Sequence, residues 1–254
     1  MKKLRSLILF VPISCLFFLE IYFFYPKSFY YCLVLLFVII SISIFAIAKK
    51  AKEPSSKWYI FLILPLFFIF STVAYTILLS SNFLIQLVFA LDVLFLYFYY
   101  KNIYYFLIRP KFYRENALEN LSSYGNFLII FFAFSAFFGF QSFLGIKTWI
   151  LILISAPVIW LVTYQVILTN GILFKNGLIY ILLNTVILIE LFWSASFLPL
   201  NYNGIGLILA ICYYMLIGII RFNLKGKEGE KKIKFYLLFG IISILAIILS
   251  SKWL

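Results

Sequence analysis

Apolar residues occur along this chain in long runs, and short polar connections separate the runs. Each run holds about 20 residues, the length that an α-helix needs to cross the hydrocarbon core of a bilayer. No stretch alternates between apolar and polar residues over about ten positions, as the strands of a membrane barrel do. The pattern therefore predicts an all-α fold, a polytopic transmembrane bundle of about nine helices. The predicted helices cover residues 6–25, 29–48, 58–80, 83–100, 124–144, 148–168, 177–198, 204–222 and 235–254.

The composition supports a membrane location. Of the 254 residues, 66% are hydrophobic and only 11% are charged, whereas about a quarter of the residues in a soluble domain are charged. The chain therefore lacks the polar residues that would cover a water-facing surface. No connection is long enough to form a soluble domain of its own. We expect a single integral membrane domain over residues 1–254, located in the cell membrane.

The basic residues predict the orientation in the membrane, because they collect in every second connection. Lys and Arg stay on the cytoplasmic side of membrane proteins. We therefore expect the N-terminus in the cytoplasm and, after nine crossings, the C-terminus outside. The net charge of +13 is explained by this topology, so we do not expect nucleic-acid binding. The connections predicted to be cytoplasmic carry their basic residues within 2–5, 49–57, 101–114, 175 and 221–234.

The residues that commonly carry enzyme chemistry are scarce. The sequence has no histidine, the commonest general base and metal ligand. Cys15, Cys32 and Cys212 lie inside predicted helices, and their spacing matches neither a disulfide framework nor a zinc site. The basic N-terminus runs into a long apolar stretch, which indicates an uncleaved first helix and not a signal peptide. We expect no enzyme activity and no cofactor.

Two acidic residues lie near the centres of predicted helices, Asp92 in "FALDVLF" and Glu190 in the run 177–198. An ionised acid at this depth costs about 2.5–3.5 kcal/mol on insertion scales, so we expect both to be protonated. Ser194 follows Glu190 by one helical turn and can share its face. We expect Asp92 to face the bundle interior and to bond a polar group on another helix. Glu190 is one candidate partner, since two acids can share a proton; a Ser or a backbone carbonyl is the alternative.

The connection 101–123 is the longest, and it mixes basic with aromatic residues. Its stretch "KFYRENALENL" could form a short helix on the inner headgroups. We expect its basic side chains to face lipid phosphates, either as ordinary cytoplasmic charge or in specific recognition. The candidate headgroup contacts are Lys101, Arg109, Lys111 and Arg114.

Small residues recur one turn apart in several predicted helices. Ser135 and Gly139 form one such pair, Gly206 and Ala210 form another, and Gly240 begins a third stripe. Small side chains let helix backbones approach closely in lipid. We expect these positions to hold the bundle together rather than to form a dimer.

Three hypotheses of function follow from these patterns. A non-catalytic membrane component, which contacts lipids and other membrane proteins, demands least of the sequence. A proton-coupled or small-solute transporter would use the two central acids, although polar residues are too sparse to line a path for a charged solute. A lipid-modifying enzyme would need clustered acids, His or metal ligands at the interface, which the sequence does not show.

The stretch "FWSASFLPLNYNGIGLILAICYYMLIGII" (192–220) resembles uncharacterised multi-pass membrane protein families of AT-rich, small-genome bacteria. The resemblance implies a polytopic membrane protein and carries no known activity. We therefore interpret the chain as an integral membrane protein of unknown activity, a non-catalytic component of the membrane.

Overall fold

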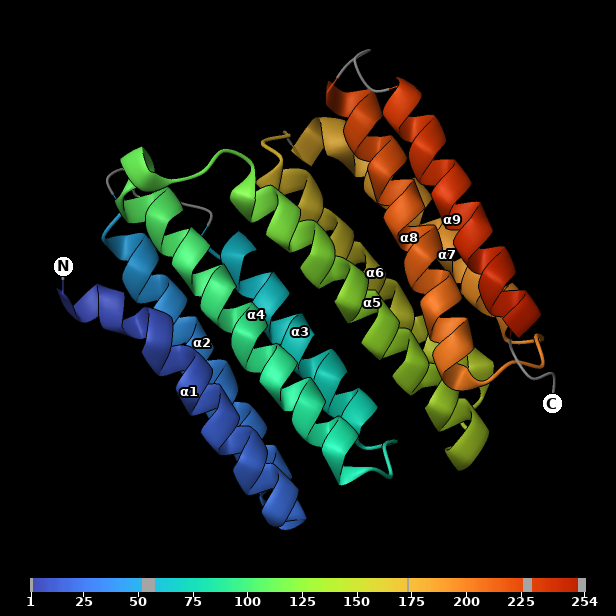
Figure 1. The fold of residues 1–254 in the computed structure, drawn as a ribbon, viewed down its shortest axis with the longest axis horizontal. Helices are drawn as coiled ribbons and strands as arrows, with labels where there is room; N and C mark the ends of the chain where they lie inside the picture. Colours follow the sequence, from blue (N-terminus) through green and yellow to red (C-terminus); the bar gives the residue numbers. More distant parts are fainter. Residues whose placement is uncertain (1, 52–57, 173, 226–229, 251–254) are drawn as a thin grey trace. The chain divides into compact units, whose positions relative to one another are not determined.

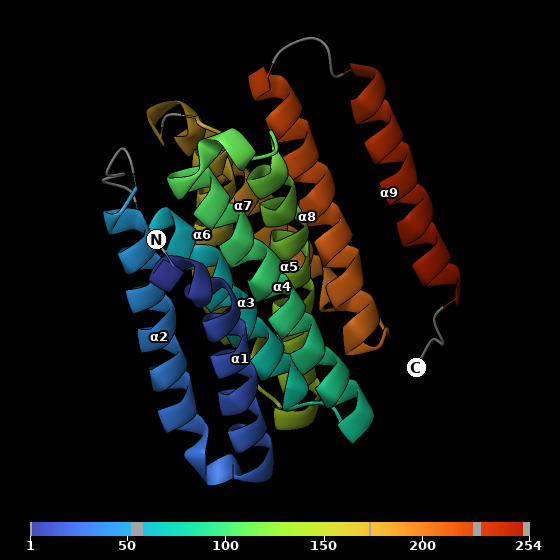
Figure 2. The ribbon, with the colours of Figure 1, turned by 60° about the vertical axis from the view of Figure 1, so that its left-hand side comes forward.

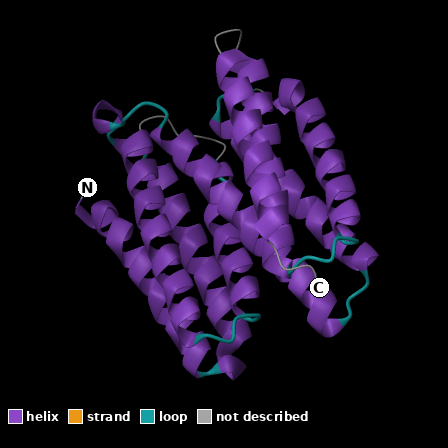
Figure 3. Ribbon diagram, turned by 45° about the vertical axis from the view of Figure 1, so that its right-hand side comes forward, coloured by secondary structure: helices purple, strands orange, loops and turns teal. Residues whose placement is uncertain are grey.

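The computed structural model describes residues 2–51, 58–172, 174–225 and 230–250, and within these ranges it is built of helices joined by turns (Figures 1 and 3). This confirms the predicted all-α class. Lys52, Lys57 and the end of the run 235–254 lie outside the described residues. The α-helices of the described part are α1 (Lys2–Phe24), α2 (Phe29–Lys49), α3 (Ile60–Thr76), α4 (Asn82–Ile108), α5 (Ala117–Leu144), α6 (Thr148–Thr169), α7 (Phe174–Ala195), α8 (Tyr202–Lys225) and α9 (Glu230–Ser250), with 3₁₀ turns η1 (Pro26–Ser28) and η2 (Pro110–Phe112).

Seven helices of the described part are long and apolar enough to cross a membrane. The apolar helices Ile60–Thr76 and Lys234–Ser250 are shorter. Nine spans of full length were expected. The third helix differs from that prediction, whereas the end of the ninth predicted run lies outside the described residues. The third helix stops at Thr76, four residues before the end of its apolar run, and the hydroxyl of Thr76 donates to the carbonyl of Val73 at 2.8 Å.

The boundaries around the predicted connection 101–123 also differ from expectation. Helix α4 continues through Lys101 to Ile108, eight residues beyond its predicted end. It stops before Pro110, because proline has no N–H to donate and disfavours a helical conformation in the residue before it. Helix α5 begins at Ala117, directly after Asn116, whose φ of 58° lies in the left-handed region that Asn tolerates. The short surface helix expected here is therefore the start of α5, preceded by η2.

The described chain divides into two compact units, residues 1–72 with 79–125 and residues 73–78 with 126–254. The prediction of one membrane domain over 1–254 stays a prediction. In the first unit, α1 packs against both α2 and α4 (Figure 2). Its core includes an aromatic stack, with ring centroids 4.0 Å apart between Phe68 and Phe95 and 6.0 Å apart between Phe95 and Tyr99. The hydroxyl of Tyr99 donates to the carbonyl of Phe61 at 2.9 Å, which ties α4 to α3.

In the second unit, α7 packs against both α6 and α8, and α9 packs against α8 (Figure 1). Gly206 of α8 lies so close to Ser135 of α5 that a Cβ atom on the glycine would overlap the serine backbone. Gly240 of α9 lies in the same way against the side chain of Met215. These contacts confirm that small residues allow close helix packing within the chain.

Candidate functional site: a buried acid and its polar neighbours

The side chain of Asp92 is completely enclosed within the first unit, with an exposed fraction of 0%. It lies on the inward face of α4, between Phe89 and Phe95, which are also buried. Its Oδ2 atom is 3.0 Å from the hydroxyl oxygen of Thr72 on α3. The structure therefore confirms that Asp92 faces the interior and bonds a polar group on another helix. The partner is a hydroxyl, as in the alternative expectation, although on threonine rather than serine.

The hydroxyl of Thr72 has more neighbours than it has hydrogens. Its Oγ1 lies 3.0 Å from the carbonyl oxygens of both Phe68 and Ile69, in addition to the Asp92 carboxyl. A carbonyl can only accept, and a hydroxyl has one hydrogen. If Asp92 is protonated, it donates to Thr72, which in turn donates to its own helix backbone. If Asp92 is ionised, Thr72 donates to it and leaves the carbonyls, so the neutral acid satisfies more of this cluster.

The second carboxyl oxygen of Asp92 is buried without a hydrogen-bond partner. Among the described residues, no Lys or Arg forms an ion pair with this acid, whose printed hydrogen-bond partner is Thr72. A buried carboxylate without a cation is strongly disfavoured, whereas a neutral acid with one free acceptor is tolerated. The group can therefore hold a proton in a site closed to water.

Further polar pairs join α4 to its neighbours on either side of Asp92. Toward the start of α4, the amide of Gln86 donates to the carboxylate of Glu20 on α1 at 3.1 Å. Toward its end, the hydroxyl of Tyr100 lies 2.7 Å from that of Ser43 on α2. The helix rises by about 1.5 Å per residue, so these pairs lie roughly 9–12 Å from Asp92 along α4.

Glu190 and Ser194 have a different environment. Both side chains are exposed on α7. The hydroxyl of Ser194 donates to the carbonyl of Leu191 at 3.0 Å, within its own helix, so Ser194 does not support the acid through that hydrogen. The role of these two residues in a polar site stays a prediction.

The four basic candidates do not form one cluster. Lys101 lies within α4 and is half-buried, with its Nζ 5.7 Å from the ring centroid of Tyr97. Arg109 directly follows the last residue of α4, whereas Lys111 and Arg114 are exposed in the turn that comes next. Their contact with headgroups stays a prediction.

Tyr113 organises the turn before α5. Its hydroxyl accepts a hydrogen bond from the Leu118 amide and donates one to the carboxylate of Glu119, both at 3.0 Å. Partial burial raises the pKa of Tyr113 to about 12; the Leu118 amide opposes that rise, and the negative charge of Glu119 adds to it. The phenol therefore remains a hydrogen-bond donor through the physiological pH range.

Buried amides in the second unit form inter-helix pairs that were not predicted from the sequence. The amide of Asn126 on α5 donates to the side-chain oxygen of Gln165 on α6 at 2.9 Å. The amide of Asn184 on α7 donates to the hydroxyl of Thr163 on α6 at 2.8 Å. All four side chains are at most 1% exposed. An amide inside an apolar run was the signal that could have found them, because a buried amide needs a partner on a neighbouring helix.

In the described part of the chain, the polar groups around Asp92 offer hydrogen bonding and storage of a proton. Within it, no group of three or more His, Cys, Asp or Glu side chains is placed to hold a metal ion.

None of the curated proteins and none of the solved structures gives a significant match to the chain. A family model matches residues 24–250, and on this match the chain belongs to DUF5656, a family of proteins of unknown function.

Proposed function

We propose that this protein is an integral membrane protein and a non-catalytic component of the membrane. The observation that carries the proposal is the apolar character of both faces of α2. Its inward face buries Leu36, Ile40 and Ile44, whereas Val34 and Ile42 on its other face are 61% and 62% exposed. A helix that is apolar all round is stable in lipid and is unfavourable on a water-facing surface.

The proposed topology places the N-terminus in the cytoplasm and the C-terminus outside. Basic residues at alternate helix ends support it: Arg5 near the start of α1, Lys49 at the end of α2, Arg109 after α4 and Arg221 near the end of α8. Such residues remain on the cytoplasmic side. Helix α3, with 17 residues, is at the lower end of the length that spans a bilayer, which is about 17–25 residues. The number of crossings, and with it the side on which the C-terminus lies, therefore depends on whether α3 and α9 both span the membrane.

The non-catalytic role is supported by the character of the buried groups. Asp92 is enclosed at 0% exposure, and its Thr72 partner is equally buried. A catalytic acid must reach a substrate within about 2.6–3.2 Å, directly or through one water. These groups instead join helices. On this proposal the partners of the protein are membrane lipids and other membrane proteins.

Proton-coupled transport is the second candidate, and a specific observation favours it. Asp92 combines complete burial with an unbonded Oδ1 atom, which leaves one acceptor open for a proton or a solute in another conformation. Buried acids of this kind mark proton relays in pumps and transporters. The substitution Asp92→Asn distinguishes the two functions. A non-catalytic membrane component would keep its role, whereas a proton-coupled transporter would lose its transport activity.

Fractionation and terminal reporters test the membrane proposal. The full chain should remain in the membrane pellet after alkaline carbonate extraction. A reporter active in the cytoplasm should work at the N-terminus, and an export-dependent reporter should work after Leu254. Release into the alkaline supernatant would overturn membrane integration. If both termini lie on one side, membrane integration still holds, but the number of membrane-spanning helices is wrong by an odd number.

A further inference from the structure

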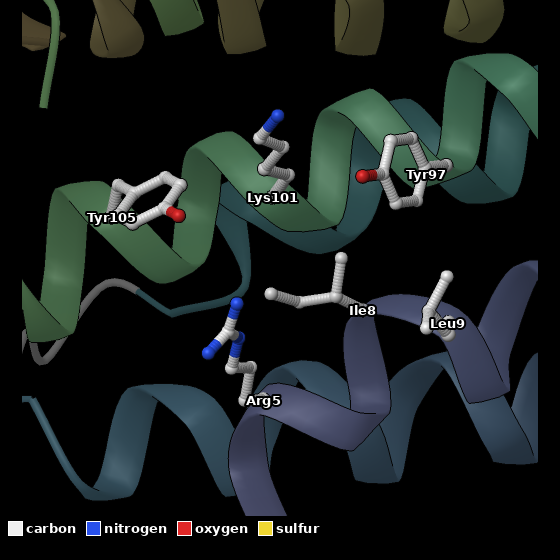
Figure 4. Close-up of a pocket in the computed structure, with 6 residues that line it drawn as sticks. All are labelled: Arg5, Ile8, Leu9, Tyr97, Lys101 and Tyr105. Carbon is white, nitrogen blue, oxygen red and sulfur yellow. The ribbon is translucent and has the colours of Figure 1, made fainter. Parts of the chain in front are cut away.

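A cavity of about 230 Å³ opens between the beginning of α1 and the last turns of α4, in the first unit (Figure 4). The two helices pack against each other. The polar residues of the cavity come from the start of α1 and from the end of α4. Its lining residues are Arg5, Ile8 and Leu9 from α1 and Tyr97, Lys101 and Tyr105 from α4.

The spacing of these residues explains why they meet. Tyr97, Lys101 and Tyr105 are four residues apart, so they lie one above another on one face of α4. Figure 4 shows the hydroxyl groups of both tyrosines turned toward Lys101 from either side, and the Arg5 guanidinium extended from α1 toward α4. Lys101 holds its ammonium group 5.7 Å from the Tyr97 ring centroid, a favourable cation–π distance.

The chemistry of the lining fits an anion. Two cationic side chains and two phenol hydroxyls supply donors, and no carboxylate is among the lining residues that the structure describes. Arginine presents paired N–H groups that match two oxygens of a phosphate, and lysine adds a point charge. A water molecule takes about 30 Å³ of liquid volume, so the cavity has room for a phosphate with an adjoining glycerol group.

Apolar side chains extend from the cavity along α1. They indicate that the part of the ligand beyond the phosphate is apolar. Leu9 forms part of the lining, and Ile13 and Phe17 follow it at one-turn intervals on the same face. Their exposed fractions are 57%, 61% and 61%. A free phosphate would not contact these three side chains, whereas an acyl chain would cover them and remove their apolar surface from water.

We propose that this cavity binds the phosphate of an anionic glycerophospholipid, with Arg5 and Lys101 on the phosphate oxygens and the acyl chains along Leu9, Ile13 and Phe17. The site rests on the proposed membrane location, and it places the bound headgroup at the cytoplasmic surface. Arg5 and Lys101, which are 96 positions apart in the sequence, act on one ligand. The lipid then links the beginning of α1 to the end of α4.

Binding of defined lipids to the full-length protein in a neutral detergent tests the site. Short-chain phosphatidylglycerol, short-chain phosphatidylcholine and inorganic phosphate are titrated separately. We expect phosphatidylglycerol to bind at least about tenfold more tightly than phosphatidylcholine, because both lipids carry the phosphate but the choline cation of phosphatidylcholine would lie beside Arg5 and Lys101. Equal binding of the two lipids to the unmodified protein would overturn the proposal. Inorganic phosphate that binds as tightly as phosphatidylglycerol would overturn the lipid assignment.

Charge-matched variants show whether the cavity is responsible. The double variant Arg5→Gln/Lys101→Gln should lose about tenfold or more in affinity for phosphatidylglycerol. Lys49→Gln/Lys50→Gln removes the same charge from exposed positions outside the cavity and should bind as the unmodified protein does. An equal loss in both would mean nonspecific attraction and would overturn the site. Arg5→Lys keeps the charge without the paired donors and should lie between them, which provides a milder variant if the double variant fails to fold.

The outcome is separable from that of the proposed function. A protein that resists carbonate extraction but shows no lipid preference overturns the lipid site alone. A protein released by carbonate overturns membrane integration before any lipid is tested.

Discussion

The carboxyl group of Asp92 on α4 lies 3.0 Å from the hydroxyl of Thr72 on α3, and neither side chain has any exposed surface. This contact joins two helices through polar groups in an otherwise apolar interior. The Thr72 hydroxyl also lies within 3.0 Å of two backbone carbonyls. The direction of the hydrogen bond between Thr72 and Asp92 therefore reports whether the acid carries a proton, which makes the pair a direct experimental target.

Substitutions of Asp92 should separate shape from charge. Asp92→Asn keeps the size and the hydrogen-bonding ability of the neutral acid, so we expect the free energy of unfolding to change by less than about 1 kcal/mol. Asp92→Lys buries a charge without a counterion and should cost roughly 3 kcal/mol or more. Thermal unfolding in detergent, followed by size-exclusion chromatography, measures both. A folded Asp92→Lys protein of normal stability would show that the site admits water.

Removing the hydroxyl of Thr72 should leave the acid without its partner. Thr72→Val has nearly the same shape and should cost about 1–3 kcal/mol, the typical penalty for a buried polar group left unsatisfied. Thr72→Ser retains the hydroxyl and serves as the control. A double-mutant cycle with Asp92→Asn isolates the pair. No coupling between the two positions would contradict the hydrogen bond.

The protonation state of Asp92 can be observed directly. We expect infrared spectra of the folded protein at pH 7 to contain a protonated carboxylic acid band that Asp92→Asn removes. The reason is that the ionised acid would be buried without a cation. Glu190→Gln is the matched control, because Glu190 lies on an exposed face and its replacement should leave the Asp92 band unchanged. A carboxylate band assigned to Asp92 would contradict the neutral state.

The contact between Gly206 and Ser135 should be sensitive to a single methyl group. Gly206→Ala places a Cβ against the Ser135 backbone, which cannot move as a flexible side chain can, so we expect destabilisation of about 1–3 kcal/mol. Gly218 lies on the same helix, and beyond its chain neighbours and the adjacent helix backbone an added Cβ there would meet no atom within 4 Å, so Gly218→Ala should remain within about 1 kcal/mol of the unmodified protein. Unfolding of the two variants in one detergent compares them. Equal stabilities would argue against close packing at Gly206.

The turn at Tyr113 should contribute a pH-dependent stability. The pKa of its phenol is raised from 10.0 to about 12, so the folded state keeps the proton after the unfolded chain has lost it. Stability from this group is therefore complete below pH 10 and falls as the pH rises from 10 to 12. We expect the difference in unfolding midpoint between the unmodified protein and Tyr113→Phe to shrink over that interval. A constant difference up to pH 12 would contradict the raised pKa.

The existence of the helices was determined by the sequence, since an apolar run of about 20 residues forms a helix in lipid whatever it packs against. The inward direction of Asp92 was predictable for a related reason, because an acid in such a run avoids lipid. Helix ends were less predictable. Helix α4 continues past Lys101 to Ile108 because a tyrosine-rich stretch with one lysine can remain helical, and Pro110 rather than the first charge stops it.

The partners of the polar and small residues were decided by the tertiary structure. Thr72 meets Asp92, and Gly206 meets Ser135, because of how neighbouring helices are rotated about their axes and shifted along them. Many rotations satisfy the same apolar pattern, since nearly every face of these helices is apolar. The cavity shared by Arg5 and Lys101 depends in the same way on the register of α1 against α4. The sequence shows both charges near the ends of apolar runs, but only the packed helices bring them to one ligand-sized space.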